Sequence, residues 1–342
     1  MTQSIYDIPA LEKHLIRNGF GGRDIRRTYR LLFREFQKID TLGWDSEVLE
    51  DTRAKFQTSY LTLISRIDSQ IDGATKLLFE TEDGKKIETV ILRIATGRTS
   101  ICVSSQVGCT EKCRFCSTGE LGFFRNLKRE EVLDQVVQAG QILASEGRSL
   151  RNIVFMGMGE PLRNYQNLVD ALDLLLHQSV FKFIPKRITV SSLGIPELIL
   201  KFAKRFPEVS LALSLNGSND KGRSEVMPIN NRYPMAELRS MLEELETIRG
   251  KEVMIEYIMF KDLNDSLESA EEVAAFLKGL QVHVNLIPYN PDYSLNKSFQ
   301  ASSTEVIDDF KKSLQEAGYK VTRRFSLGQD IAAACGQLAN KG

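Results

Sequence analysis

The sequence contains no apolar run close to the roughly 18 residues that a membrane-spanning helix requires. Its first residues, Met1 to Asp7, lack the charged start and the apolar stretch of a secretory signal. An excess of one charge is also absent, because 45 Lys and Arg balance 45 Asp and Glu over 342 residues. A coat of positive charge for nucleic acid is therefore excluded, although a local basic face is not. We expect a cytoplasmic protein without a membrane segment.

Histidine and cysteine are both scarce. The three histidines, His14, His177 and His283, show no metal-ligand spacing, and we assign them to structure or surface. The five cysteines are Cys102, Cys109, Cys113, Cys116 and Cys335. An odd number without a secretory signal argues against a disulfide framework. Three cysteines within eight residues indicate metal or redox chemistry instead.

The first 70 residues predict a helical domain with few strand signals. From Arg23 to Phe36, apolar side chains recur at helical spacing on one face: Ile25, Tyr29, Leu32 and Phe36. The opposite face carries four arginines and no acid: Arg23, Arg27, Arg30 and Arg34. A solvated outer face is the simpler interpretation. Contact with RNA phosphates is the alternative, because such contacts require positive charge without neighbouring acids.

The rest of the chain predicts an α/β fold. Residues 75–94 predict a β-hairpin around Asp83-Gly84. Strands are then expected at 100–107, 153–156, 187–191, 209–215, 253–259, 282–287 and 319–324, with helices between them. Six strand–helix repeats predict a parallel sheet, as a partial (β/α)6 barrel or, alternatively, a doubly wound sheet. We expect three units: a helical RNA-contact domain (1–70), a hairpin linker (71–95) and a partial barrel (96–342).

Residues suited to chemistry follow the predicted strands. Residues 109–116 follow the first strand, 157–160 the second, and 289–291 the sixth. Ser191 ends the third strand, and residues 214–216 end the fourth. Because parallel strands end at one edge of a sheet, these groups should form one site.

The cysteine triplet has the spacing C-x3-C-x2-C, with Phe115 directly before its last member. Three thiolates in one short loop can bind three corners of an iron–sulfur cluster and leave one iron open. A structural zinc site is the alternative, but it normally takes four ligands in paired motifs. Only Cys102 or Cys335 could supply the fourth ligand, so the spacing favours a cluster.

Residues 109–116, Cys-Thr-Glu-Lys-Cys-Arg-Phe-Cys, resemble the signature of radical S-adenosylmethionine (SAM) enzymes. Three further segments resemble the RlmN/Cfr group of RNA adenosine methyltransferases: 102–109, 157–162 and 330–338. The similarity runs from about Glu88 to Leu338 and is weaker in the first 70 residues. The segment around Cys335 makes it specific, because few other radical enzymes place a cysteine there.

The resemblance implies one 4Fe-4S cluster held by Cys109, Cys113 and Cys116. It also implies two molecules of SAM per turnover. The first methylates Cys335, and the second is cleaved reductively to a radical that removes hydrogen from that methyl group. The resulting methylene radical adds to an adenine carbon. Cys102 then resolves the protein–RNA adduct by forming a transient disulfide with Cys335.

The resemblance assigns roles to further residues. Glu88 matches the family's proton acceptor, whereas on its own it predicts only a solvated strand carboxylate. Residues 157–160 match the segment that holds the SAM amino group; glycines permit close approach, and a carboxylate accepts from an ammonium. The implied SAM-binding residues are Gly159, Glu160, Ser191, Ser214, Leu215, Asn216 and Asn290.

Three positions depart from the family pattern. Asn216 stands where histidine is usual, so a hydrogen bond is kept but a charge is lost. Ala332 replaces an aspartate, and Leu327 precedes Gly328 where the RlmN type has arginine and the Cfr type phenylalanine. Pro161, in contrast, is typical of the RlmN type. The departures bear on the substrate or target carbon rather than on the radical chemistry.

The expected function is methylation of carbon 2 of an adenosine in 23S rRNA, with tRNA as a possible further substrate. The same chemistry at carbon 8 is the first alternative. A cluster-bearing RNA-binding regulator without turnover is another, but it would need neither Cys102 nor Cys335. A radical enzyme acting on a small molecule would leave the arginine face unexplained. We expect a monomer that takes electrons from a flavodoxin-type donor.

Overall fold

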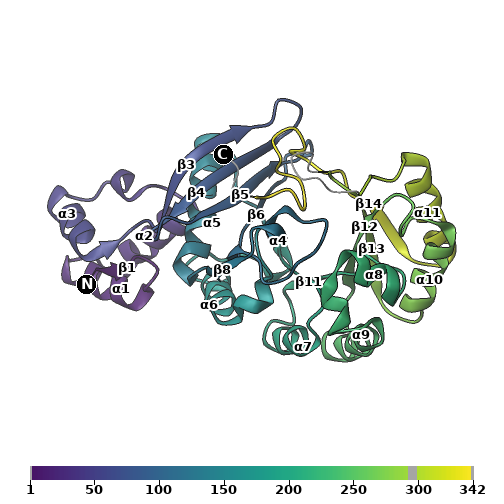
Figure 1. The fold of residues 1–342 in the computed structure, drawn as a ribbon. Helices are drawn as coiled ribbons and strands as arrows, with labels where there is room; N and C mark the ends of the chain where they lie inside the picture. Colours follow the sequence, from purple (N-terminus) through teal and green to yellow (C-terminus); the bar gives the residue numbers. More distant parts are fainter. Residues whose placement is uncertain (1, 292–298, 340–342) are drawn as a thin grey trace.

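The computed structural model describes residues 2–291 and 299–339. The remaining residues, 1, 292–298 and 340–342, belong to the predicted first and third units and lie outside the described part. Figure 1 shows an N-terminal helical group at one end, followed by a long sheet with helices packed along it. No helix within the described ranges is long and apolar enough to cross a membrane.

The N-terminal group contains three helices: α1 (Ile8–Arg17), α2 (Gly22–Phe33) and α3 (Ser46–Lys55). A short parallel pair, β1 (Gln3–Ser4) and β2 (Phe56–Gln57), joins its two ends. The helical prediction extends too far, because Leu61–Asp68 forms strand β3. This strand lies at the edge of the large sheet and exposes most of its side chains. Its sequence therefore does not alternate between apolar and polar residues as a half-buried strand would.

Helix α2 is shorter than predicted and has a smaller arginine face. It buries Ile25, Tyr29 and Leu32 as expected but ends at Phe33. Phe36 lies beyond it with a φ of 53° and still reaches the core. The guanidinium of Arg34 turns away from the helix and donates to the carbonyls of Val180 (2.8 Å) and Gln178 (2.7 Å). The exposed arginine face therefore comprises Arg23, Arg27 and Arg30, without Arg34.

The large sheet has ten strands in the order β14-β13-β12-β11-β10-β9-β6-β5-β4-β3. Its parallel part comprises β6 (Thr99–Cys102), β9 (Asn152–Phe155), β10 (Ile188–Ser192), β11 (Ser210–Ser214), β12 (Val253–Met259), β13 (Val282–Pro288) and β14 (Lys320–Arg323). These strands follow one another in sequence order, whereas a doubly wound sheet reverses its order at a switch point. The sheet stays open, with β3 and β14 at its edges, which confirms the partial barrel.

The predicted hairpin is confirmed and extends the same sheet. Strands β4 (Ala74–Thr81) and β5 (Lys86–Arg93) pair antiparallel across the Asp83-Gly84 turn. Gly84 has a φ of 73°, a conformation that glycine adopts without strain. Strand β5 pairs with β6, and β4 pairs with β3, so the hairpin is built into the barrel wall.

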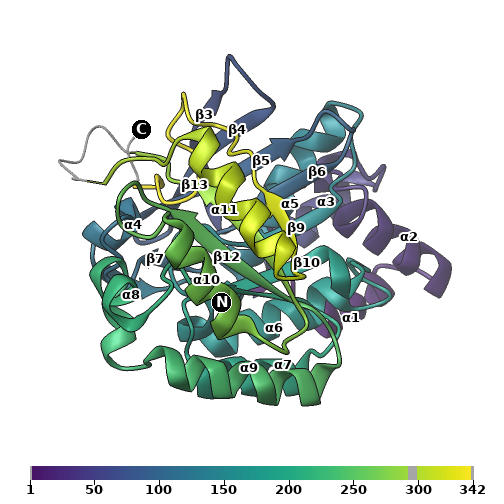
Figure 2. The ribbon, with the colours of Figure 1, turned by 90° about the vertical axis from the view of Figure 1, so that its right-hand side faces the viewer.

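The connecting helices lie along one face of the sheet (Figures 1 and 2). They are α5 (Arg129–Ser145), α6 (Tyr165–Leu176), α7 (Pro196–Arg205), α9 (Met235–Arg249), α10 (Leu267–Leu277) and α11 (Thr304–Glu316). Shorter helices are α4 (Ser117–Glu120), α8 (Asp220–Val226), η1 (Ile39–Thr41), η2 (Pro161–Asn164), η3 (Pro185–Arg187) and η4 (Pro228–Asn231). Fully buried side chains such as Leu172, Phe202 and Phe310 fill the layer between helices and sheet.

The strand predicted at 100–107 is two strands in different sheets. After β6 ends at Cys102, residues Gln106–Gly108 form β7, which pairs antiparallel with β8 (Phe123–Asn126). Gly108 has a φ of 76°, and a Cβ there would meet the carbonyl oxygen of Gly122 at 1.8 Å. The two strands therefore close tightly around the loop that carries the cysteine triplet.

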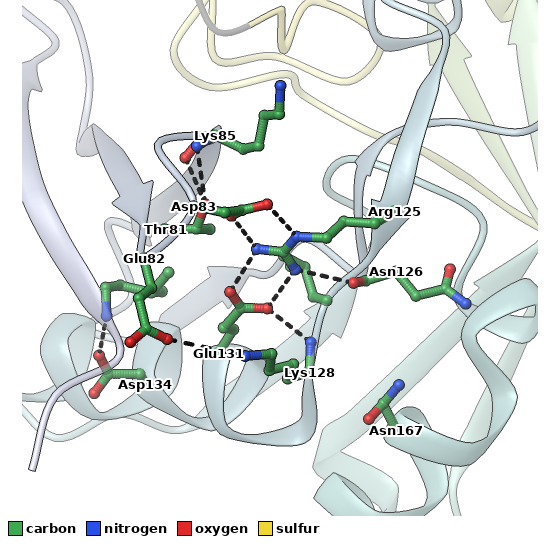
Figure 3. Close-up of polar contacts among 12 residues, drawn as sticks. Thr81, Glu82, Asp83, Lys85, Arg125, Asn126, Lys128, Glu131, Asp134 and Asn167 are labelled. Carbon is green, nitrogen blue, oxygen red and sulfur yellow. Dashed lines mark hydrogen bonds and ion pairs between the residues drawn. The ribbon is translucent and has the colours of Figure 1, made fainter. Parts of the chain in front are cut away.

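A salt-bridge network anchors this small hairpin to its surroundings (Figure 3). Arg125 on β8 donates to Asp83 in the β4–β5 turn (2.6 and 2.8 Å) and to Glu131 on α5 (2.8 Å). Glu131 also accepts from the backbone N–H of Lys128 at 2.7 Å. The guanidinium holds the pKa of Asp83 well below its usual range. One side chain thus fixes the cysteine hairpin relative to the sheet and to α5.

A buried carboxylate fixes the N-terminal domain to the barrel. Asp134 on α5 accepts from the Tyr6 hydroxyl at 3.0 Å. It also accepts from the backbone N–H groups of Tyr60 (2.8 Å) and Leu61 (2.9 Å). Burial raises the pKa of Asp134, although these hydrogen bonds oppose the shift. The helical domain is therefore held by specific polar contacts as well as by apolar packing.

Candidate active site

One cavity of about 480 Å³ lies where the parallel strands end. This volume is typical of a small-molecule site, for which about 300–1,000 Å³ is usual. The cavity brings together most of the predicted site residues: Cys102, Cys109, Cys113, Cys116, Gly159, Glu160, Ser191, Ser214, Asn216 and Cys335. Three predicted residues, Glu88, Leu215 and Asn290, are not among those that line it.

The cysteine triplet lies between β7 and α4, in a loop held by its own backbone. The N–H of Cys109 donates to the carbonyl of Gly122 (3.0 Å), and the N–H of Cys116 donates to that of Cys113 (3.1 Å). The ring of Phe115 packs against the ring of Phe260, with centroids 5.5 Å apart. The three thiols therefore have fixed positions on one wall of the cavity.

The electrostatics of these thiols fit a bound cluster. Burial raises the pKa of Cys109 to about 12 and that of Cys113 well above its usual value, and neighbouring cysteines add to both shifts. A positively charged iron core would stabilise the thiolates that this environment otherwise disfavours. In the described part of the chain, no three His, Cys, Asp or Glu side chains are arranged to hold a single metal ion. In a cluster each thiolate binds its own iron, so the sulfurs need not converge.

Glu160 is buried at the end of β9 and lines the cavity. Its carboxylate accepts from the backbone N–H groups of Leu162 (3.1 Å) and Leu193 (2.9 Å). Burial raises the pKa of Glu160 to about 7. A cationic ligand would therefore both pair with this carboxylate and restore its charged form.

The glycines before Glu160 serve a purpose that the sequence did not indicate. A Cβ on Gly157 would lie 2.7 Å from the carbonyl carbon of Val103, and one on Gly159 would lie 2.5 Å from the Cβ of Gln106. Gly157 thus permits close packing against the segment after β6, and Gly159 permits close packing against the start of β7. Both glycines also line the cavity, so they can contact a ligand as well as the neighbouring backbone.

Strands β10 and β11 add polar groups to the cavity wall. The hydroxyls of Ser191 and Ser214 lie 3.4 Å apart. Asn216 has a φ of 54°, a left-handed conformation that asparagine tolerates better than most residues. Its amide accepts from the N–H of Ile258 (2.8 Å) and donates to the sulfur of Met227 (3.3 Å). The amide therefore connects the end of β11 to β12. A neutral side chain is sufficient for these hydrogen bonds.

Leu215 and Asn290 lie behind the cavity. Leu215 is fully buried, and its carbonyl accepts from the guanidinium of the buried Arg223 at 3.0 Å. The Asn290 amide donates to the Ser326 hydroxyl (3.0 Å) and accepts from Gln329 (2.7 Å). Asn290 thereby connects the end of β13 to the segment that leads to Cys335.

Glu88 is not a solvated carboxylate, as its strand position alone had indicated. It is 0% exposed, and the C-terminal segment lies against its carboxylate. The carboxylate lies 3.3 Å from the ammonium of Lys76 and accepts from the N–H of Ala339 at 2.9 Å. It therefore contacts the C-terminal segment four residues beyond Cys335.

Hydrogen bonds anchor that segment between Gly328 and Gly336. Gly328 N–H donates to Asp72 at 2.8 Å, and Ser69 donates to Asp330 at 2.8 Å. Further along, the carbonyl of Gly336 accepts from Ser117 N–H at 2.7 Å. Ala332, where the similar family has aspartate, has a φ of 50°. Aspartate adopts this conformation more readily than alanine, so the replacement carries a local conformational cost.

Cys102 and Cys335 line the same cavity, and Cys335 lies close enough to affect the charge of Cys102, although they are far apart in the sequence. Both are free, and Cys102 is buried at the end of β6. Burial, with a smaller effect from the nearby Cys335, raises the pKa of Cys102 to about 12. Arg324, just beyond β14, is close enough to both sulfurs to oppose that shift.

Arg324 and Glu256 are site residues that the sequence did not reveal. Both line the cavity, and the Arg324 guanidinium lies 4.0 Å from the Glu256 carboxylate. A charged residue within the otherwise apolar run Val253–Met259 was the available signal. That signal did not identify Arg324 as the ion-pair partner of Glu256, because β12 and β14 are separated by β13 in the sheet and by two helices in the sequence.

Comparisons with known proteins agree with this site. Residues 103–277 match the model of the radical SAM superfamily. An open parallel barrel with a cysteine triplet at its strand ends defines that class, and the chain belongs to it. The chain is 37% identical to a radical SAM methyltransferase from Sphaerobacter thermophilus, with a TM-score of 0.91 over 99% of this chain and 100% of the other.

Two relatives place the chain more closely. It is 52% identical to a probable RNA methyltransferase of Rhodopirellula baltica over 92% of this chain and 84% of the relative. It is 42% identical to the dual-specificity RNA methyltransferase RlmN of Anaeromyxobacter dehalogenans over 82% of this chain and 77% of the relative. The chain therefore belongs to the RlmN group of radical SAM RNA methyltransferases.

Proposed function

We propose that the protein methylates carbon 2 of a specific adenosine in 23S rRNA and that tRNA is a further substrate. One observation carries the proposal: Cys102 and Cys335 share a cavity with the cysteine triplet. A radical SAM enzyme without a protein-bound methyl carrier needs only the triplet. Two additional thiols in contact with the same space suit a methyl group that is carried on sulfur and released by thiol exchange.

The residues of the cavity divide into two groups. Cys109, Cys113 and Cys116 would hold the 4Fe-4S cluster, which supplies the electron that cleaves SAM. The Glu160 carboxylate is placed to accept from the ammonium of SAM, since it lines the cavity and is buried. The hydroxyls of Ser191 and Ser214 are further polar partners on the same wall.

The other group performs the transfer to RNA. Cys335 takes the methyl group from a first SAM and later bonds through its carbon to adenine. The Cys102 thiolate attacks the Cys335 sulfur, and the bond from that sulfur to the transferred carbon breaks. The carbon keeps the electron pair and takes up a proton, which completes the methyl group of the base, and a Cys102–Cys335 disulfide remains for an external reductant. Arg324 stabilises thiolate in this cavity. Glu88 is the proposed proton acceptor, and its contact with Ala339 places it beside the segment that carries Cys335.

The test is the nucleoside composition of 23S rRNA treated with the purified enzyme, SAM and a flavodoxin-type reductant. The rRNA comes from a strain that lacks this gene. We expect 2-methyladenosine by chromatography and mass spectrometry, and none with Cys335→Ala. The isomer 8-methyladenosine would assign the reaction to carbon 8. Binding of rRNA without any modified nucleoside would favour a regulator.

The cluster has its own test. Anaerobically purified protein should contain iron and sulfide, and replacement of Cys113 by Ala should remove both. Zinc in stoichiometric amount, with no uptake of iron on reconstitution, would contradict the proposed cofactor.

A further inference from the structure

An aromatic ring stands at the rim of the cavity. Phe325 is 79% exposed, the highest value among the exposed large hydrophobic side chains of residues 2–291 and 299–339. It nevertheless lines the cavity together with its neighbours Arg324 and Ser326. A single exposed aromatic is common on protein surfaces. Its place beside the methyl-carrying end of the active cavity is what requires an explanation.

The backbone around Phe325 is fixed on both sides. Arg324 N–H donates to the carbonyl of Leu286 at 2.8 Å, which continues the pairing of β14 with β13. The Ser326 hydroxyl accepts from Asn290 at 3.0 Å. The ring is therefore presented to solvent from a held segment, so that binding a partner there costs little ordering of the chain.

Positive charge flanks the ring. The guanidinium carbon of Arg323 lies 5.9 Å from the centroid of the Phe325 ring. Arg323 is itself held by Thr304 (3.2 Å) and Asp308 (3.7 Å). On the other side in the sequence, Arg324 extends toward the two cysteines and Glu256. An exposed aromatic ring with a guanidinium beside it suits a flat, electron-rich group attached to an anionic chain better than it suits an apolar protein surface.

We propose that Phe325 stacks against the target adenine of the RNA as this base enters the cavity toward Cys335. The inference rests on the proposed function. A base must leave its own stack before an enzyme can reach its carbon atoms, and this step is costly. An aromatic side chain at the rim replaces part of the lost stacking. Arg323, beside the ring, supplies the positive charge for an adjoining phosphate.

The experiment uses the full-length protein and an RNA fragment with 2-aminopurine at the methylated adenosine. Stacking on an aromatic ring quenches the fluorescence of this base. Phe325→Ala and Phe325→Leu remove the aromatic ring, and Phe325→Tyr keeps it. Ile71→Ala is the matched control, because Ile71 is 71% exposed but does not line the cavity.

We expect Phe325→Ala and Phe325→Leu to weaken RNA binding by about five- to a hundredfold, the range for loss of one stacked base. Quenching should fall in both, and Phe325→Tyr should retain both properties. Ile71→Ala should match the wild type. Methylation of Cys335 by SAM without RNA, followed by peptide mass, should be unchanged in every variant.

Three outcomes overturn the inference. Equal affinity and quenching in all variants, while the wild type still forms methyladenosine, would refute the stacking role and leave the proposed function intact. If Phe325→Leu kept both the RNA affinity and the quenching, the ring would act only through its apolar volume. A concentration-dependent dimer of the wild type that Phe325→Ala abolishes would make the ring a contact between copies of the chain. Failure of the wild type to form methyladenosine would instead count against the proposed function.

Discussion

The Nη1 atom of Arg324 lies 4.0 Å from Oε2 of Glu256, in the wall of the cavity that Cys102 and Cys335 also line. Burial raises the pKa of Glu256, and the guanidinium opposes that shift. The same guanidinium opposes the rise in the pKa of Cys102. The single charge of Arg324 thus stabilises the ionised forms of two buried groups, the Glu256 carboxyl and the Cys102 thiol.

Replacement of Arg324 by Gln should slow alkylation of Cys102 by iodoacetamide in cluster-free protein. Loss of a nearby positive charge raises the thiol pKa, and a rise of one unit lowers the thiolate fraction about tenfold. We expect a three- to tenfold lower rate, read from the mass of the Cys102 peptide between pH 7 and 9. Arg324→Lys should retain most of the rate.

Two controls separate charge from misfolding. Arg323→Gln changes the adjacent arginine, which pairs with Asp308, and should leave the rate unchanged. Arg324→Gln combined with Glu256→Gln removes the unpaired carboxylate and should recover stability but not alkylation. Equal alkylation in the wild type and Arg324→Gln would show that the guanidinium does not influence the thiol.

The buried carboxyl of Glu160 should leave a signature in the pH dependence of stability. Its pKa of about 7 in the folded protein lies above the ordinary value of 4.5, so the folded state binds more protons between these values. The free energy of unfolding therefore falls as the pH rises from about 4.5 to 7 and levels off above that. Between these two pH values, Glu160 should lower the free energy of unfolding by about 3 kcal/mol.

Glu160→Gln should lack this contribution. Urea unfolding of cluster-free protein at several pH values, from 5 to 8, measures the difference between wild type and variant. We expect the wild type to lose stability relative to the variant as the pH rises. The lost hydrogen bond to Leu162 or Leu193 adds a constant offset, so the slope is the decisive quantity. A difference that does not change with pH would contradict the raised pKa.

How much of this site could be foreseen depends on which contacts are local in sequence. The triplet and the strand ends follow from short-range patterns: an apolar strand, then a polar loop, then an amphipathic helix. The pairing of Arg324 with Glu256 depends instead on three strands lying side by side. Nothing in the residues near Glu256 indicates which cation its carboxylate will meet.

Errors in the fold prediction have similar causes. Strand β3 exposes Leu63 and Ile64 at the sheet edge, so its sequence lacks the burial pattern of an inner strand. Glu88 is a charged residue next to Ile87 and Thr89 in a predicted strand, where solvent exposure is the usual expectation. Its burial comes from Ala339 and the C-terminal segment, 251 residues away, which no local pattern could place there.

The exposed arginines of α2 should contribute to RNA affinity. Arg27→Ala with Arg30→Ala should weaken binding and lower the slope of log affinity against log salt by roughly one unit or slightly less for each lost phosphate contact. Fluorescence anisotropy with an rRNA fragment over a salt series gives both quantities. Arg34→Ala is the control, because its guanidinium is bound to two backbone carbonyls and should affect stability but not the slope. An unchanged slope in the double variant would assign α2 to a merely solvated face.

Cys102 and Cys335 should have separable functions. In the proposed mechanism Cys335 carries the methyl group, so Cys335→Ala should never become attached to RNA. Cys102 acts only after the carbon–carbon bond to adenine has formed, so Cys102→Ala should accumulate as a covalent protein–RNA species. The double variant should not accumulate it, because the attachment point is gone. A denaturing gel with and without nuclease treatment distinguishes all three proteins.

A purely structural pair of thiols would give a different pattern. Each residue is small and lines the same cavity, so loss of either would cause a similar, modest destabilisation and no adduct. The asymmetry between the two single variants is therefore the diagnostic feature, and it does not depend on how stable either one is. If the two single variants behave alike and Cys102→Ala shows no nuclease-sensitive band, the methyl-carrier mechanism is wrong for this chain even with an intact cluster. If the band appears only in Cys102→Ala, the meeting of these two sulfurs is the step that releases the methylated base.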